Sequence, residues 1–276
     1  MLKRIITAVV GIPLVVFILT GTGVTVFALC MFGITGLALY EYYCITVDSA
    51  SPAERWVGIV LGGLVFGAAC LGLLFFAGGP HGAVSAAVAA CVLSAFVLFI
   101  YYAFFDAVRG EMFSRMAFSF TGVFLIGFLL FYIVLLRSAP GGAQLVLLLF
   151  IITWAGDTGA YFAGTWIGRR LLCPEVSPKK TVEGSLGGLA ASILAALCCR
   201  MFLADNVSLL NCLVIGAGVN AMNQVGDLGE SMVKRAFNVK DSGTLLPGHG
   251  GILDRIDSLL LAAPFLFYYL QMIVRL

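Results

Sequence analysis

The sequence predicts an all-α, polytopic integral membrane protein with about nine transmembrane helices. Apolar residues make up 61% of the 276 residues and charged residues only 11%, against the ~45–50% and ~25% that are usual in soluble domains. Several apolar runs approach the ~20 residues that a helix needs to cross the hydrocarbon core of a bilayer. This composition excludes a soluble globular domain, a disordered chain and a disulfide scaffold.

The apolar runs define the expected helices in chain order. They cover residues 5–20, 23–43, 56–78, 84–105, 116–136, 143–166, 186–204, 208–230 and 253–274. Continuous apolar runs favour helices over the strands of a membrane barrel, in which apolar and polar residues alternate. Gly21-Thr22-Gly23 joins the first two runs and predicts a tight turn within a helical hairpin.

The basic residues predict the orientation in the membrane. With the N-terminus in the cytoplasm, only Arg137, Arg200 and Arg275 of the 16 Lys and Arg residues lie outside. The opposite orientation would invert this bias. We therefore expect a cytoplasmic N-terminus and a C-terminus on the outer side.

We expect a single membrane domain whose two parts differ in chemistry. Residues 1–145 form N-terminal transmembrane helices with little chemistry, and residues 146–276 form a catalytic transmembrane region. The catalytic part contains two charged cytoplasmic loops, about 167–185 and about 231–252.

A polar stripe marks the eighth expected helix and the residues after it. At ~100° per residue, the stripe comprises Asn220, Asn223, Gln224, Asp227, Glu230, Ser231 and Lys234. Hydrogen bonding between helices would explain the amides alone. Two carboxylates and an ammonium on one stripe favour a hydrated functional site, because ionisable groups are costly inside a bilayer.

The last expected helix opens with a second group of charges. Asp254, Asp257 and Ser258 share one face by their i, i+3, i+4 spacing, and Arg255 lies between the two carboxylates. One Asp would be ordinary in the first turn of a helix, but two with an Arg exceed that explanation.

Two loops add groups that could bind phosphate. His249-Gly250-Gly251 precedes the last helix, and glycine amides near a helix N-terminus can bind anions. The same glycines could form only a turn, and the histidine could be a structural hydrogen-bonding residue.

The earlier loop combines hydroxyls with paired lysines. Its candidate residues are Ser177, Lys179, Lys180 and Thr181. Paired lysines could instead contact anionic lipid or only fix the topology. Upstream, Asp157 lies within an apolar helix, where it could bind a ligand or serve as a structural partner of an arginine.

Together these groups indicate phosphoryl or nucleotidyl transfer at the cytoplasmic face. Carboxylates hold Mg²⁺ together with substrate phosphates, and positioning and charge neutralisation do most of the work in such reactions. The sequence contains no Walker A, HExxH or Ser/His/Asp triad pattern. A net charge of only +2 provides no basic field for nucleic acid.

Residues 231–257 resemble the signature of the phosphatidate cytidylyltransferases, or CDP-diacylglycerol synthases. The matching residues are Ser231, Lys234-Arg235, Lys240-Asp241, Gly243, Pro247, His249-Gly250-Gly251 and Asp254-Arg255-Ile256-Asp257. The resemblance continues upstream to Gly226-Asp227-Leu228, to Ser177-Pro178-Lys179-Lys180-Thr181 with Glu183-Gly184, and to Asp157 with Tyr161. It covers a little under half of the chain.

The resemblance implies a reaction of CTP with phosphatidic acid that gives CDP-diacylglycerol and pyrophosphate. It also implies an enzyme of the bacterial inner membrane, in contact with membrane lipids and with its active site facing the cytoplasm. A CTP-dependent transferase acting on another lipid, such as a polyprenol, and an ion-coupled transporter are the alternatives. A homodimer is compatible with the glycine-rich helices, and no nucleic-acid partner is expected.

The resemblance also suggests a role for each candidate residue. Mg²⁺ or another divalent cation is the expected cofactor, held by Asp227 and Asp254, and a monovalent cation is a further candidate. The other expected catalytic residues are Lys234, Arg255, Asp257 and His249. The expected substrate-binding residues are Lys179, Lys180, Ser177, Thr181, Arg235, Lys240, Ser231, Gly250 and Gly251, the last two supporting the leaving pyrophosphate together with His249.

Overall fold

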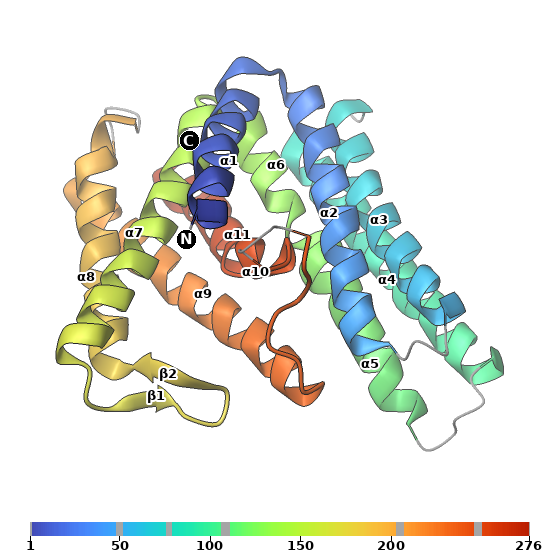
Figure 1. Cartoon of the computed structure of the whole chain (residues 1–276). Coiled ribbons are helices and arrows are strands. Elements are labelled where there is room, and N and C mark those ends of the chain that lie inside the picture. Colours follow the sequence, from blue (N-terminus) through green and yellow to red (C-terminus); the bar gives the residue numbers. More distant parts are fainter. Residues whose placement is uncertain are drawn as a thin grey trace. The chain divides into compact units, whose positions relative to one another are not determined.

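A computed structural model describes residues 2–47, 52–75, 79–105, 111–202, 207–245 and 250–275. The described residues form helices joined by short connections, apart from one small β-hairpin (Figure 1). The predicted all-α membrane fold is therefore confirmed. His249 lies outside the described residues.

Each apolar run of the sequence coincides with a helix or with consecutive helices. The helices are α1 (Leu2–Gly21), α2 (Val24–Thr46), α3 (Pro52–Phe75), α4 (Gly79–Phe105), α5 (Met112–Gly122), α6 (Phe131–Ser138), α7 (Gly142–Ile167), α8 (Val182–Cys198), α9 (Leu209–Ala236), α10 (Leu253–Ile256) and α11 (Leu259–Tyr269). Two π-helical segments, η1 (Val123–Phe128) and η3 (Leu270–Val274), and a 3₁₀ turn, η2 (Cys199–Phe202), join or extend them.

Six spans among the described residues are long and apolar enough to cross a membrane. They are Val24–Thr46, Pro52–Phe75, Gly79–Phe105, Met112–Ser138, Gly142–Ile167 and Leu253–Val274. Helix α8 is apolar but has only 17 residues, and α9 carries the polar stripe. The count of about nine transmembrane helices is therefore not confirmed.

The chain divides into two compact units, each built from separate stretches of sequence. Unit 1 comprises residues 1–12, 23–134 and 237–255, and unit 2 comprises residues 13–22, 135–236 and 256–276. Each unit therefore combines residues from the two halves of the sequence.

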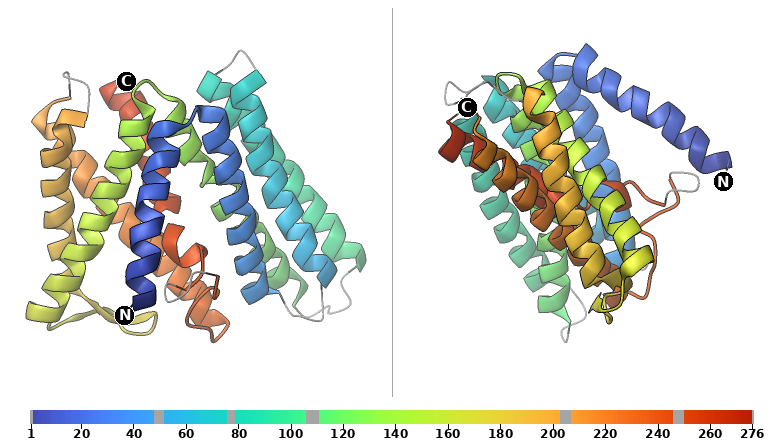
Figure 2. Two further views of the ribbon diagram at one scale, coloured as in Figure 1. Left: turned by 45° about the horizontal axis from the view of Figure 1, so that its top comes forward. Right: turned by 90° about the vertical axis from the view of Figure 1, so that its left-hand side faces the viewer.

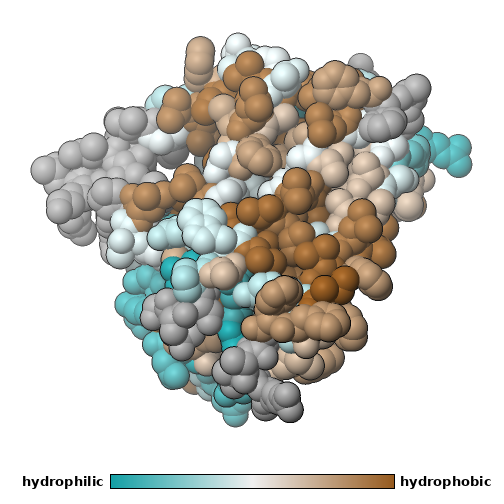
Figure 3. Space-filling model, turned by 90° about the vertical axis from the view of Figure 1, so that its right-hand side faces the viewer, coloured by the Kyte–Doolittle hydropathy of each residue, from teal (hydrophilic) through white to brown (hydrophobic). Residues whose placement is uncertain are grey.

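Unit 1 is a bundle in which α3 packs against both α2 and α4 (Figure 1). Glycine allows backbones to approach closely here, because a Cβ on Gly127 would lie 2.6 Å from the carbonyl oxygen of Gly62. Apolar side chains such as Val60, Leu64 and Phe96 are exposed on α3 and α4. Figure 3 shows hydrophobic residues gathered over much of the face that lies on the right-hand side of Figure 1. Such a surface suits contact with hydrocarbon rather than water.

Unit 2 contains α7, α8, α9 and α11, and Figure 2 shows α7 and α8 side by side. The connection from α7 to α8 differs from the predicted loop, because it folds into an antiparallel hairpin of β1 (Leu171–Cys173) and β2 (Ser177–Thr181). Helix α8 begins at once after β2, since the Thr181 hydroxyl oxygen accepts the Gly184 N–H at 3.0 Å and caps the helix.

The last expected helix is interrupted near its start. A single turn, α10, ends at Ile256, and α11 begins only at Leu259. The shared face expected for Asp254, Asp257 and Ser258 assumes one continuous helix, so it stays a prediction. The chain instead bends at Asp257-Ser258, where the Asp257 carboxylate accepts the Ser258 N–H at 2.6 Å.

Candidate active site

A pocket of 460 Å³ lies within unit 2, between the hairpin and three helices. Its lining residues come from α7, the hairpin, α8 and α9: Gly156, Asp157, Ala160, Tyr161, Gly164, Thr165, Leu172, Ser177, Lys179, Lys180, Thr181, Gly184, Ser185, Asn220, Gln224 and Asp227. Five of the predicted site residues, Ser177, Lys179, Lys180, Thr181 and Asp227, thus share one cavity. Its volume is in the range of small-molecule sites.

An ion pair connects two walls of this pocket. The Lys180 ammonium on β2 pairs with the Asp227 carboxylate on α9. Both side chains are partly exposed, 28% and 38% respectively. An anionic ligand and a cation could therefore both reach this pair from the pocket.

Asp157 on α7 provides a second carboxylate in the pocket. Its Oδ1 accepts a hydrogen bond from Asn223 Nδ2 at 2.9 Å. Asn223 is 2% exposed, and its Oδ1 has no hydrogen-bond partner among the described residues. The Asn223 side chain thus holds the Asp157 carboxylate in place through Nδ2, and its buried Oδ1 is left able to accept.

The other amides of the polar stripe serve packing between helices. Asn220 Nδ2 donates to Ser192 Oγ at 3.0 Å, and Ser192 Oγ donates to the Ile152 carbonyl at 2.9 Å. Gln224 Nε2 donates to the Ser185 carbonyl at 3.2 Å, and Gln224 Oε1 accepts from the Ser185 hydroxyl. The stripe therefore divides between structural hydrogen bonds and the chemistry of the pocket.

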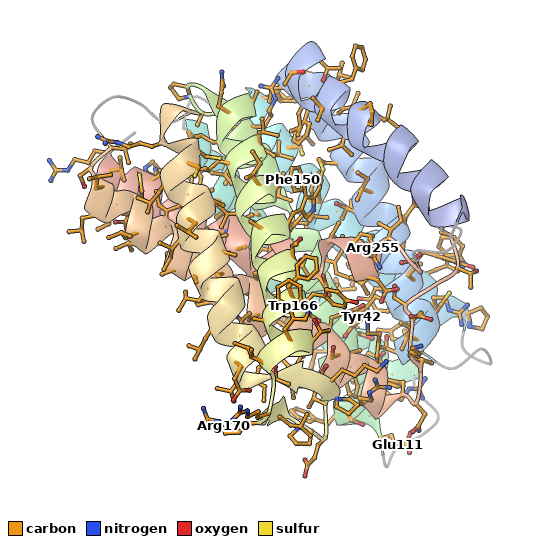
Figure 4. All side chains as sticks on the ribbon, turned by 60° about the vertical axis from the view of Figure 1, so that its left-hand side comes forward. Tyr42, Glu111, Phe150, Trp166, Arg170 and Arg255 are labelled. Carbon is orange, nitrogen blue, oxygen red and sulfur yellow. The ribbon has the colours of Figure 1, made fainter. Side chains whose placement is uncertain are left out.

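The hairpin that carries the lysines is anchored at its base. The Glu183 carboxylate accepts the backbone N–H groups of Arg169 and Arg170 at 3.0 and 3.1 Å and pairs with the Arg170 side chain at 3.2 Å. These hydrogen bonds stabilise the charged form and lower the pKa of Glu183 to about 2. Figure 4 labels Arg170 here, next to the C-terminal end of α7.

The hairpin is also fixed toward α9. Arg235, expected to bind phosphate, donates from Nε to the Val176 carbonyl at 3.2 Å. Lys234 pairs with the buried Glu230 carboxylate one turn earlier, beside Ser231. The Arg235 hydrogen bond thus joins α9 to the hairpin, whereas the Lys234–Glu230 pair lies within α9.

Asp257 joins this charged cluster from the start of α11. It is 8% exposed, and Asp227, Lys234 and Asp157 lie within electrostatic reach of it. Gly226 allows this approach, because a Cβ there would lie 2.6 Å from the Asp257 carbonyl oxygen. Unit 2 therefore gathers Asp157, Asp227 and Asp257.

Unit 1 holds the remaining signature residues around Asp254. The Asp254 Oδ2 accepts the N–H of Gly251 at 2.8 Å and that of Ser242 at 3.0 Å. The Gly251 amide, which was expected to hold pyrophosphate, thus donates to Asp254 in this structure, and its role toward pyrophosphate stays a prediction. Gly250 has a φ of +79° and a Cβ there would lie 2.6 Å from Asp254 Oδ2, so it serves the same turn.

Glu41 on α2 also belongs to this cluster, although it was not among the residues predicted from the sequence. Its carboxylate accepts the backbone N–H groups of Ile252 and Leu253 and the hydroxyl of Ser242. A buried carboxylate within an apolar segment was the signal that could have identified it.

Lys240 and Arg255 are exposed in unit 1; Figure 4 labels Arg255. Asp227 belongs to unit 2 and Asp254 to unit 1. The binding of one metal ion by both of these carboxylates therefore stays a prediction.

The donors of the unit 2 pocket fit a hard divalent cation. Mg²⁺ is usually held by one or two carboxylates, with water and substrate phosphates completing its shell. Asp227 and Asp157 supply two carboxylates. The Asn223 side chain, whose Oδ1 has no hydrogen-bond partner among the described residues, is bonded to Asp157. The described residues contain no group of three or more His, Cys, Asp or Glu side chains placed to hold a metal ion.

The chain matches the model of the cytidylyltransferase family over residues 2–273. It is also similar to proteins named phosphatidate cytidylyltransferase. That of Staphylococcus epidermidis is 41% identical over 165 residues, which are 60% of this chain and 59% of that protein. That of Bacillus subtilis is 38% identical over 161 residues, 58% of this chain and 60% of that protein. The similarity thus spans about three fifths of these relatives, whereas the family match extends over nearly the whole sequence: the chain belongs to the cytidylyltransferase family.

Proposed function

We propose that this protein transfers the cytidylyl group of CTP to phosphatidic acid, giving CDP-diacylglycerol and pyrophosphate. The observation that carries the proposal is the unit 2 pocket, whose lining combines Asp157 and Asp227 with Lys179 and Lys180 beside the candidate membrane span α7. Family membership and the names of the relatives favour this reaction among phosphate transfers.

The reaction needs no covalent enzyme intermediate. A phosphate oxygen of phosphatidic acid forms a bond to the α-phosphorus of CTP, and the bond from that phosphorus to the bridging oxygen of the β-phosphate breaks. Pyrophosphate leaves with the bonding electrons. The protein's task is to align the two phosphates and to offset their negative charge.

The pocket residues can perform both tasks. Lys179 and Lys180 come from the anchored hairpin, so their ammonium groups have a fixed base from which to bind phosphate. The hydroxyl of Ser177, at the start of the same strand, adds a neutral donor. A phosphate that binds Lys180 would compete with its ion pair to Asp227 and so free that carboxylate.

We propose Mg²⁺ as the cofactor, with Asp227 as its principal protein ligand and Asp157 beside it. When bound, such a cation offsets charge on the phosphate oxygens. Asp254, held in unit 1 by Ser242 and Gly251, is the second proposed ligand. Asn223 orients Asp157 by its hydrogen bond, and Lys180 neutralises Asp227 until the ligand enters.

The outer surface of α7 favours a lipid substrate. Tyr161 and Thr165 line the pocket, and Tyr161 is 67% exposed. One turn further, Trp166 is 78% exposed; Figure 4 shows it and Phe150 on this helix. Aromatic side chains of this kind gather where hydrocarbon meets headgroups. A lipid phosphate could thus enter the pocket while its acyl chains stay in the bilayer.

We further propose a bacterial inner membrane as the location, with the pocket on the cytoplasmic side. The relatives are bacterial. The hairpin at the pocket carries Arg170, Lys179 and Lys180, and such basic segments favour the cytoplasmic side. CTP is available on that side.

Two radiolabels test the proposed reaction in purified protein. In micelles with phosphatidic acid and Mg²⁺, CTP labelled on its α-phosphate should transfer label to the lipid, whereas label on the γ-phosphate should appear in pyrophosphate. Transfer of the γ-label to a lipid would indicate a kinase and contradict the proposal. A polyprenol phosphate offered in place of phosphatidic acid tests lipid specificity, and preferred use of it would also contradict the proposal.

A further inference from the structure

Described residues on both sides of the glycine-rich signature loop of unit 1 contact a carboxylate of this chain. Glu41 comes from α2, whereas the loop residues that it contacts lie beyond residue 240. Glu41 Oε1 accepts the N–H of Ile252 at 3.0 Å, and Oε2 accepts the N–H of Leu253 at 2.8 Å. Glu41 is 7% exposed, so this anion is buried within unit 1.

Ser242 joins Glu41 to Asp254. Its hydroxyl donates to Glu41 Oε2 at 3.2 Å and accepts the N–H of Asp254 at 3.3 Å. Its own N–H donates to Asp254 Oδ2 at 3.0 Å. One serine therefore fixes both the backbone and the carboxylate of Asp254 relative to Glu41.

The loop glycines make room for Glu41. A Cβ on Gly243 would lie 2.5 Å from Glu41 Oε1, and a Cβ on Gly251 would lie 2.4 Å from Glu41 Oε2 and 2.1 Å from Ser242 Oγ. Both approaches are closer than real Cβ atoms tolerate, and they involve a side chain held by three hydrogen bonds. The absence of a Cβ at Gly243 and Gly251 thus leaves the space that the Glu41 carboxylate occupies.

We propose that Glu41 is a positioning residue for the cytidylyl transfer, which sets the orientation of Asp254 through Ser242 and the 250–253 backbone. This inference rests on the proposed function, in which Asp254 binds the metal. Glu41 itself touches neither substrate nor metal in this role. It acts as the fixed anion around which the loop folds, so that Asp254 is oriented before a ligand arrives.

Glu41→Gln tests the proposal, because the amide keeps the size of the side chain but places an NH₂ group against donors. Glu54→Gln is the matched control: Glu54 is also buried in unit 1, at 3% exposure, but pairs with Arg115 and Tyr102. If Glu41→Gln fails to fold, Ser242→Ala removes the bridging hydroxyl with a smaller change.

The first readout is amide hydrogen exchange of the protein without substrate or metal. Glu41→Gln and Ser242→Ala should accelerate exchange in residues 250–255, and Glu54→Gln should not. The second readout is CDP-diacylglycerol formation against Mg²⁺ concentration. Loss of an outer-shell partner costs about 10- to 100-fold in metal affinity or activity, so Glu41→Gln should raise the half-saturating Mg²⁺ by that factor, and Glu54→Gln should leave it unchanged.

The results separate this inference from the proposed function. An active wild-type protein whose loop exchange and Mg²⁺ dependence are unchanged by Glu41→Gln would overturn the positioning role, as would an equal effect of Glu54→Gln. A wild-type protein that forms no CDP-diacylglycerol would instead overturn the proposed function, and with it the assignment of Asp254 that Glu41 is inferred to serve.

Discussion

Replacing Lys180 by methionine separates the catalytic value of the pocket ion pair from its structural value. Methionine keeps most of the apolar stem and removes the ammonium that pairs with Asp227. The two side chains are 28% and 38% exposed, so water screens their attraction. Exposed ion pairs contribute about 0.2–1 kcal/mol. The free energy of unfolding should therefore fall by no more than about 1 kcal/mol.

The expected loss of activity is much larger. A hydrogen bond to a charged group contributes about 1.5–3 kcal/mol, and each ~1.4 kcal/mol corresponds to a tenfold change in rate. If Lys180 binds a phosphate in the transition state, Lys180→Met should lower kcat/KM for CTP by about 10- to 150-fold. Lys180→Arg keeps the charge and should retain more activity than the methionine variant.

Initial rates of CDP-diacylglycerol formation at varied CTP measure this loss, and thermal unfolding in the same detergent measures stability. Arg170→Met is the matched control, because Arg170 also pairs with a carboxylate, Glu183, but is 75% exposed and is not among the described residues lining the pocket. A Lys180→Met variant within twofold of the wild-type kcat/KM would refute the reasoning, and so would an Arg170→Met variant that loses as much activity.

Three further predictions concern the same unit. Asp227→Asn should abolish turnover while the protein still inserts and keeps its unfolding temperature, and near-normal activity in the purified variant would contradict the metal assignment. Glu183 has a pKa near 2 in the folded protein against an ordinary 4.5; because the folded value is lowered, its contribution to stability is complete above pH 4.5 and disappears as the pH falls toward 2. The difference in unfolding temperature between wild type and Glu183→Gln should therefore be constant at neutral pH and shrink below pH 4.5, and a difference independent of pH would contradict this linkage. Gly156→Ala should lower the free energy of unfolding by about 1–3 kcal/mol, because its Cβ would lie 2.5 Å from the Asn220 amide nitrogen, whereas Gly229→Ala on α9, with no atom within 4 Å, should be neutral or slightly stabilising; equal effects in chemical denaturation would contradict the packing.

The helices were predictable because hydrocarbon thickness and backbone hydrogen bonding impose both length and apolar character on a membrane span. The hairpin of β1 and β2 was not, since Ser177–Thr181 contains a proline and two lysines and shows no apolar alternation. Its stability depends on groups outside the strands: the Glu183 carboxylate at its base and the Arg235 contact with Val176. No local pattern signals such contacts.

The pocket was partly predictable for a related reason. Charges are costly among apolar helices, so Asp157, Lys180 and Asp227 were conspicuous in the sequence, and the structure places all three in one cavity. The division of labour within the polar stripe was not predictable. Whether an amide such as Asn223 supports a carboxylate or a neighbouring helix depends on which element packs against it.

Backbone amides of the glycine-rich loop contact anions of the chain itself. Glycines with free amides favour an anion, and the sequence analysis assigned that anion to the nucleotide. In the structure the Gly251 amide donates to Asp254, and the neighbouring amides of Ile252 and Leu253 donate to Glu41. Two hundred or so residues separate Glu41 from the loop, so spacing within the signature cannot reveal it. An internal anion has a consequence that a bound nucleotide would not have: the backbone of residues 251–253 is held before substrate arrives, and binding energy from CTP is not consumed in positioning it. Loop exchange in Glu41→Gln should therefore be faster in the absence of CTP, whereas a loop built for the nucleotide would be equally mobile in both proteins until CTP is added.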